Sequence, residues 1–208
     1  TRTLLAALPK QPAFCEILPG FEPLEEQHPL PATRECLIFG RGEDFLLKGF
    51  GIASKAFGIL CADDSLKDVT FVVRGAERGR DLEMRNRILK ESGVSGLSLR
   101  LRVFPFSDDN SRVRADLLSS SVVIMPSLSE GFGLTAMEAL ECGVPVLATN
   151  ESGFAALLKH LDAAAAGQFI VPVTGDEEAD AKAWANAIRR VLHSSADARN
   201  DAQRLQGV

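Results

Sequence analysis

The sequence predicts an α/β fold: a single Rossmann-like, doubly wound parallel sheet with helices on both faces. Short, almost wholly apolar runs recur along the chain, as expected of strands that are buried on both sides of a parallel sheet. Segments with helical periodicity separate these runs, and strands that alternate with helices build parallel sheets. About six such strand–helix units fit into one domain of this length.

The expected strands are apolar runs that end at glycine, at proline or in a polar turn. The run 35–40 (ECLIFG) ends at Gly40, and the run 121–126 (SVVIMP) stops at Pro126. Residues 97–104 (LSLRLRVF) alternate apolar and basic side chains, which is the period of a half-exposed strand. We expect strands at 13–18, 35–40, 68–75, 97–104, 121–126, 144–149 and 168–173.

The expected helices carry apolar residues at helical spacing. In the segment 48–61, Phe50, Ala53, Phe57 and Leu60 fall on one face. The segment 133–142 is closed by Gly143, a residue typical of the position just after a helix. We expect helices at 48–61, 81–92, 133–142, 153–160 and 177–193, and a short helix that ends near 116–118.

The domain is expected to occupy residues 34–193. Residues 1–33 would form a strand and a linker that leads into it, because 21–33 contains three prolines and three acids. Residues 194–208 are expected to form a polar C-terminal tail. The chain begins at Thr1 without a secretory leader, which suggests a piece of a longer protein.

Composition excludes several function classes. No apolar run reaches the roughly 18 residues of a transmembrane helix. The net charge of −5 disfavours nucleic acid as a partner, because such binding draws on a basic surface. The four cysteines form no C-x-x-C pair, so we expect buried free thiols in a reducing, cytoplasmic compartment. The three histidines lie far apart and give no metal-binding signature.

The most informative segment is 126–145 (PSLSEGFGLTAMEALECGVP), between a buried strand and a helix. Gly131 and Gly133 would let the backbone approach a ligand closely. The first turn of the helix then offers unpaired N–H groups and a partial positive charge, which suit a phosphate. The alternative is a plain tight turn with a glycine hinge.

Two carboxylates bracket this turn. Glu138 lies about 7 Å along the helix from Gly133, and Glu130 directly precedes the turn. A phosphate at the helix tip would have a carboxylate on either side, and carboxylates accept hydrogen bonds from sugar hydroxyls. This spacing suits a nucleotide sugar. The alternative for Glu138 is a solvated helix face shared with Glu141.

Two cations occur in the segment 38–49 (IFGRGEDFLLKG). Arg41 follows a strand end, and Lys48 opens the next helix. Both would lie at the carboxyl edge of the sheet, where they could neutralise a departing diphosphate. The alternative is a pair of ordinary surface cations.

The segment 121–153, with the pattern PS-x-x-EGFG-x-x-x-MEAL-x-CG-x-PV-x-AT, resembles the signature of the retaining nucleotide-sugar glycosyltransferases of family 4. The pair Gly40-Arg41 and Lys48-Gly49 is similar to their phosphate-binding element. The resemblance covers about residues 14–193. It implies one half of a GT-B fold, the C-terminal, donor-binding domain, whose missing N-terminal partner domain would carry the acceptor site.

The resemblance also implies residue roles. Glu130 would hold hydroxyls of the transferred sugar and Glu138 the ribose, while Arg41 and Lys48 would stabilise charge on the leaving diphosphate. The catalytic residues would be Arg41, Lys48 and Glu130. The donor-binding residues would be Gly40, Arg41, Lys48, Arg74, Gly75, Phe104, Phe106, Glu130, Gly131, Phe132, Gly133, Leu134, Thr135 and Glu138.

Within that set, the backbone amides at 132–134 would face the sugar and the diphosphate, and Thr135 would extend the contact. The turn at 74–75 and residues 104–106 would border the base. The family typically needs no metal, in line with the absence of an Asp-x-Asp motif here. We expect no cofactor; the nucleotide-diphosphate sugar is the donor substrate.

The sequence departs from the family pattern in two places. Residues 152–156 (SGFAA) replace a Gly-Gly-x-Pro-Glu element, and the turn after the third strand reads RGAERGRD (74–81). These departures and the missing half keep open a second reading, a non-catalytic nucleotide-sugar-binding or scaffold module. A dinucleotide oxidoreductase is disfavoured, because no G-x-G-x-x-G follows the first strand.

Overall fold

The central sheet of the computed structural model, which describes residues 28–206, has six strands, all parallel. They are β1 (Glu35–Phe39), β2 (Thr70–Ala76), β3 (Leu101–Pro105), β4 (Val122–Met125), β5 (Val146–Thr149) and β6 (Ile170–Val171). Their order is β3-β2-β1-β4-β5-β6, so the direction of winding reverses between β1 and β4. The predicted doubly wound parallel sheet is confirmed. At such a reversal the loops beyond the strand ends diverge and leave a crevice for a ligand.

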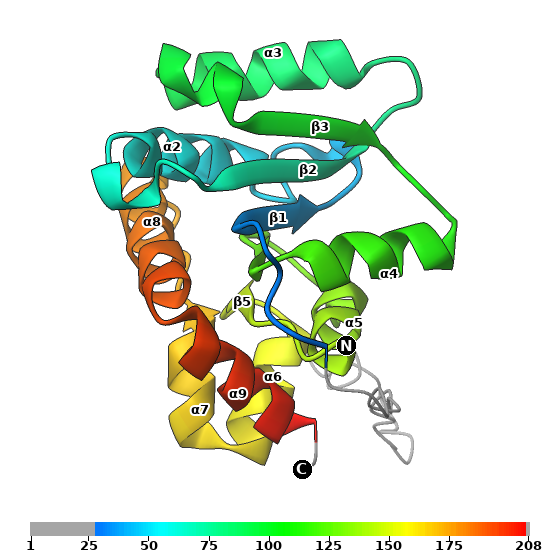
Figure 1. Cartoon of the computed structure of the whole chain (residues 1–208), viewed down its shortest axis with the longest axis vertical. Helices are drawn as coiled ribbons and strands as arrows, with labels where there is room; N and C mark the ends of the chain where they lie inside the picture. Colours follow the sequence, from blue (N-terminus) through cyan, green and yellow to red (C-terminus); the bar gives the residue numbers. More distant parts are fainter. Residues whose placement is uncertain (1–27, 207–208) are drawn as a thin grey trace, which may run out of the picture.

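Helices lie on both faces of the sheet. They are α2 (Phe50–Cys61), α3 (Asp81–Ser92), α4 (Asn110–Ser119), α5 (Leu134–Glu141), α6 (Gly153–Leu161), α7 (Ala163–Phe169), α8 (Glu177–His193) and α9 (Ser195–Leu205). Short 3-10 turns occur at Gly42–Asp44, Asp64–Leu66 and Ser95–Leu99. Figure 1 shows α2 and α8 on one side of the sheet and α4 and α5 on the other.

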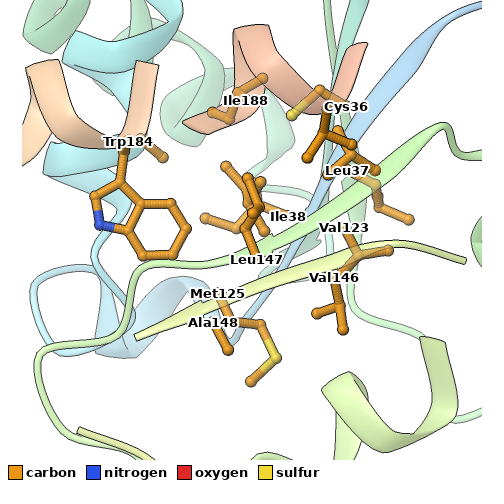
Figure 2. Packing of buried hydrophobic residues seen from close by; sticks show 14 of the residues in the cluster. Cys36, Leu37, Ile38, Val123, Met125, Val146, Leu147, Ala148, Trp184 and Ile188 are labelled. Atoms are coloured by element: carbon orange, nitrogen blue, oxygen red, sulfur yellow. The ribbon is translucent and has the colours of Figure 1, made fainter. Parts of the chain in front are cut away.

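The core forms where the apolar strands meet the helices on either side. Figure 2 shows Trp184 and Ile188 of α8 beside Ile38 of β1 and Leu147 of β5, and all four are fully buried. Burial of large apolar side chains is the main favourable term in folding. It fixes the strand ends that carry the candidate site.

The third strand is shorter than predicted. Residues 95–99 form a 3-10 turn, and the strand begins only at Leu101. Leu99 is 92% exposed, so the alternation of apolar and basic residues did not mark a continuous buried face. The strand predicted at 168–173 is also shorter than expected. The helix α7, which begins with four alanines, extends to Phe169, so only Ile170–Val171 form the strand. The strand predicted at 13–18 lies outside the described residues.

Residues 195–205, expected to be part of a polar tail, form the helix α9, which carries a buried face. Ala198, Ala202 and Leu205 lie in the core cluster. Beyond its end, the Gln206 side-chain amide donates to the carbonyl oxygens of Leu140 (2.8 Å) and Glu141 (2.7 Å). The segment after 193 therefore caps the C-terminal end of α5, the helix that follows the glycine turn.

Two of the cysteines are buried free thiols, as expected, namely Cys36 and Cys142. Burial raises the pKa of Cys142 to about 11, so it stays protonated at neutral pH. Cys61 is partly exposed at the end of α2, and Cys15 lies outside the described residues.

Candidate functional site

An open cleft of about 820 Å³ lies beyond the carboxyl ends of β1 and β4, at the reversal of strand order. The cleft is large enough for a nucleotide-sized ligand. Of the residues expected to bind a donor, all but Gly75, Phe104 and Gly131 line it. The lining residues from that set are Gly40, Arg41, Lys48, Arg74, Phe106, Glu130, Phe132, Gly133, Leu134, Thr135 and Glu138.

The N-terminal end of α5 opens into this cleft. Gly133 precedes the helix with φ 92°, a left-handed backbone conformation that side-chain-bearing residues rarely adopt. No side chain of residues 28–206 caps the helix, so its first N–H groups are open to an outside acceptor. Thr135, in the first turn, also lines the cleft. An anion that binds here meets both free N–H donors and the positive end of the helix dipole.

Lys48 and Glu130 form an ion pair on the cleft wall. Lys48 Nζ lies 2.7 Å from Glu130 Oε2, and the two side chains are only 27% and 15% exposed. The Ser127 hydroxyl donates to the same carboxylate oxygen at 3.3 Å. These three side chains come from the loops after β1 and β4, which a backbone bond also joins, from Leu128 N to Leu47 O at 2.9 Å.

The second expected cation, Arg41, follows β1 and is exposed at the cleft. Its guanidinium lies 5.5 Å from the ring centroid of Phe106, at the limit of a cation–π contact. The residue thus joins the end of β1 to the segment after β3. Its charge is available to an anionic ligand.

Glu138 projects from the second turn of α5 into the same cleft as Arg41 and Lys48. The pKa of Glu138 is raised, first by partial burial and then by the negative charge of Glu141. Both causes disfavour the ionised carboxylate, and no donor among the described residues offsets them. A ligand hydroxyl at this position would supply one.

Arg74 has a structural partner that the sequence did not reveal. It is buried, and its guanidinium donates to both carboxylate oxygens of Asp116 on α4, at 2.6 and 3.0 Å. A third bond reaches the Pro105 carbonyl at 3.1 Å, and the Phe104 ring lies 4.7 Å away. Arg74 therefore ties β3 and α4 to the cleft floor, and Phe104 packs behind it rather than lining the cleft.

Gly75 and Gly131, which do not line the cleft, shape its walls. A Cβ at Gly75 would lie 1.6 Å from the Gly40 carbonyl oxygen, so only glycine permits the close approach of β2 to the end of β1. The Gly131 carbonyl accepts from Gly153 N at 2.9 Å, and the Phe132 carbonyl from Phe154 N at 2.7 Å.

Those bonds show how the departure at 152–156 is accommodated. Ser152 caps α6, accepting from Ala155 N at 3.1 Å and donating to the Thr149 carbonyl at 2.9 Å. The segment holds the loop after β4 through its backbone.

Sequence reasoning missed several polar residues of the cleft. Asp44, Ser107, Asp108 and Asn110 line it, and the last three directly follow the segment 104–106. In the sequence, only their position after a predicted strand end could have indicated that they line the cleft, because single polar residues in a loop form no recognisable motif.

The whole chain, residues 1–208, matches the model of a family described as "Family 4 Glycosyltransferase in conflict systems". The chain belongs to this family. Its described part has the Rossmann-like fold of the C-terminal domain of GT-B glycosyltransferases. This bears out the family resemblance in the sequence.

Curated relatives of this family-4 glycosyltransferase domain include two bacterial proteins named D-inositol 3-phosphate glycosyltransferase. That of Paenarthrobacter aurescens is 31% identical over 176 residues, which cover 84% of this chain and 39% of the relative. That of Rhodococcus opacus is 28% identical over 163 residues, which cover 78% and 34%. The chain thus spans less than half the length of these relatives.

Two solved structures show the same fold. The C-terminal domain of a group 1 glycosyl transferase, LpcC, from Francisella tularensis matches with a TM-score of 0.67 and 22% identity, covering 90% of this chain and 92% of that one. Sucrose-phosphate synthase from Thermosynechococcus elongatus matches with a TM-score of 0.69 and 23% identity, covering 99% and 50%. Among residues 28–206, no helix is long and apolar enough to cross a membrane.

Proposed function

We propose that the cleft binds a nucleoside-diphosphate sugar and that the whole protein transfers the sugar to an acceptor with retention of anomeric configuration. The observation that carries the proposal is the convergence of opposite charges in one cleft. Arg41, Lys48 and the uncapped start of α5 attract a diphosphate, and the carboxylates of Glu130 and Glu138 suit hydroxyl groups. Membership of a glycosyltransferase family supports the reaction class.

We expect each part of such a donor to lie against a different part of the cleft. The diphosphate would lie against the first turn of α5, near Arg41 and Lys48. Glu138 would accept hydrogen bonds from the ribose hydroxyls and Glu130 from the sugar hydroxyls. Phe106, with the polar residues after it, would border the base.

Donor binding would rearrange the Lys48–Glu130 pair. Each of these residues neutralises the other, with Lys48 Nζ 2.7 Å from Glu130 Oε2. A diphosphate offers Lys48 a doubly charged partner, and the sugar offers Glu130 hydroxyl donors. The pair therefore holds both side chains near their working positions before the donor arrives, which lowers the entropic cost of binding.

During transfer, negative charge grows on the leaving diphosphate while the sugar becomes oxocarbenium-like. Fixed cations and a helix N-terminus aimed at that oxygen charge stabilise the transition state more than the ground state. Arg41, Lys48 and the amides of α5 would supply this stabilisation. We propose that they do so without a metal ion. We therefore expect the transfer activity to depend little on added metal ions.

The acceptor site would come from a second domain of the whole protein. The relative from Paenarthrobacter aurescens is more than twice as long as the part this chain matches, since only 39% of it is covered. The described domain by itself would bind donor and turn it over slowly.

Isothermal titration calorimetry with UDP, GDP, ADP and their sugars tests the proposal. We expect one of these series to bind with a dissociation constant below about 1 mM, which corresponds to a binding free energy of about −4 kcal/mol or stronger. The Arg41→Ala/Lys48→Ala variant should lose most of that binding. If a folded sample binds none of them at millimolar concentration, the proposal is wrong.

Loss of glycosyl transfer in a Glu130→Ala variant of the whole protein would separate an enzyme from a non-catalytic module. An unchanged biological function in that variant would favour the module. The Ser111→Ala variant, on the exposed first turn of α4, serves as a matched control.

A further inference from the structure

A buried arginine without a partner lies on α9. Arg199 is 3% exposed, and its Nε and both Nη atoms have no hydrogen-bond partner and no contact with solvent in the described part of the chain. A guanidinium group is always charged and carries five N–H donors. Burying such a group with none of them satisfied is among the most unfavourable arrangements in a protein interior.

The other groups around Arg199 do not neutralise it. Burial lowers its pKa, and within the part of the chain that the structure describes only the thiol of Cys142 opposes this effect; burial keeps that thiol itself protonated. The C-terminal end of α5 would attract a cation, but the Gln206 amide already donates to its Leu140 and Glu141 carbonyls. The charge of Arg199 therefore lacks a counter-ion among residues 28–206, and a bound anion would neutralise it.

A cavity of about 270 Å³ adjoins Arg199. Among residues 28–206, its polar lining consists of Arg199 and of side chains that can donate a hydrogen bond, namely those of Asn200, Gln203 and His28, and none of these lining residues is a carboxylate. The lining residues are His28, Pro29, Leu30, Ala196, Arg199, Asn200 and Gln203. None of these residues lines the donor cleft.

We infer that Arg199 anchors a second binding site, distinct from the donor cleft, for a small oxyanion of the phosphate or carboxylate type. Guanidinium pairs with such anions through two parallel N–H bonds, which a chloride ion does not reproduce. The amides of Asn200 and Gln203 would complete the cradle. Because the guanidinium nitrogens are screened, entry of the anion requires a local change of side-chain rotamers, which the long arginine side chain permits.

Thermal unfolding is the first test, carried out in the Arg41→Ala/Lys48→Ala background so that phosphate has little affinity for the donor cleft. Sodium phosphate and sodium acetate are compared with sodium chloride at equal ionic strength. A ligand that binds only the folded state at ten times its dissociation constant should raise the midpoint by about 3–5 °C. A higher midpoint in phosphate indicates a phosphate site, and a higher midpoint in acetate indicates a carboxylate site.

Arg199→Met keeps most of the side-chain volume and removes the charge. We expect this variant to unfold at a higher temperature than its parent in chloride and to show no response to phosphate or acetate. Arg78→Met, at an exposed arginine before α3, is the matched control and should respond as the parent does.

A spectroscopic measurement follows Arg199 itself. Its Nε–Hε NMR resonance, assigned by its absence in Arg199→Met, should shift in a saturable way with the anion that raises the midpoint. The inference is overturned if neither anion acts, if Arg199→Met responds as its parent does, or if that variant is less stable than its parent in chloride. The last result would mean that the protein already satisfies the charge. Nucleotide binding is measured separately, so failure here leaves the donor proposal untouched.

Discussion

At the residue scale, the donor cleft depends on a few charged side chains whose neighbours set their behaviour. Lys48 and Glu130 neutralise each other, whereas the Arg41 guanidinium lies beside the aromatic ring of Phe106. Arg74 has the same chemistry as Arg41 but is committed to Asp116. Residue type alone therefore does not distinguish a ligand-binding cation from a structural one. The side chain with which each cation pairs makes this distinction.

The Lys48–Glu130 pair predicts opposite effects on two ligands. In Glu130→Gln, a nucleoside diphosphate no longer competes with a carboxylate for Lys48, and its affinity should rise about fivefold, equivalent to ~1 kcal/mol for a partly buried pair. The nucleotide sugar loses a charged acceptor for its hydroxyls. Its affinity relative to the diphosphate should fall at least about tenfold.

Calorimetry with both ligands checks this result, and Ser127→Ala is the control, because it removes a neighbour of Glu130 but no charge. Equal changes for the two ligands would contradict the exchange of partners proposed for Lys48.

Glu138 predicts a pH dependence of nucleotide binding. Its pKa is raised by burial and by Glu141, and only the ionised form accepts two ribose hydroxyls. Affinity should be complete above this raised pKa and should fall as the pH drops through it, earlier than for an ordinary glutamate. Glu138→Gln should bind weakly at every pH, and Glu141→Gln should move the fall to lower pH. Titrations between pH 4.5 and about 8 check both, since an unperturbed glutamate ionises near 4.3.

The same shift carries a stability cost with a defined sign. An acid whose folded-state pKa is raised favours the folded state below its unfolded pKa, and this contribution is lost as the pH rises through the folded value. At neutral pH the ionised Glu138 therefore works slightly against folding. Glu138→Gln should raise the unfolding midpoint at pH 7 while it weakens binding. A lower midpoint would contradict the burial argument.

At the element scale, α5 is held at both ends by segments distant in sequence. The loop after β5 bonds to the glycine turn before the helix, and Gln206 bonds to the carbonyls at its end. A helix of eight residues is too short to be stable alone, so these contacts fix where its N-terminus points. The anion site of the cleft thus depends on α9 as well as on its own motif.

The Arg74–Asp116 ion pair fixes α4 against β2 in a similar way. Arg74→Met should lower the free energy of unfolding by about 3 kcal/mol, because it leaves the Asp116 carboxylate without a partner at a mostly buried position. Chemical denaturation measures this effect. Lys67→Met, which breaks an exposed pair with Asp64, is the control and should cost under about 1 kcal/mol. A loss confined to nucleotide binding would instead make Arg74 a ligand residue.

At the scale of the whole molecule, we propose that the described domain is the donor-binding part of a longer transferase. We expect the isolated chain to bind donor with an affinity that added EDTA does not change, since two arginine or lysine cations and a helix terminus replace a metal. Calorimetry with and without EDTA measures this, with a metal-dependent sugar transferase run alongside. A more than tenfold loss in EDTA would overturn the metal-free proposal, and an unchanged value would support it.

The sequence by itself determined the parallel sheet, most of its strands and helices, and the segments whose residues meet in the cleft. It could do so because buried strands and amphipathic helices leave periodic patterns, and because parallel strands bring their carboxyl ends to one edge. The glycines and acids at 130–138 could also be recognised from the sequence, because they lie in one continuous segment and their spacing is therefore visible there.

Only the tertiary structure decided which charges are paired. Lys48 and Glu130 are 82 residues apart, Arg74 and Asp116 are 42 apart, and no local pattern links them. The packing of α9 on α5, and with it the isolation of Arg199, likewise arises from contacts between distant segments. A charge takes its role from the dielectric and the partners that the fold places around it, and these are properties of space rather than of sequence order.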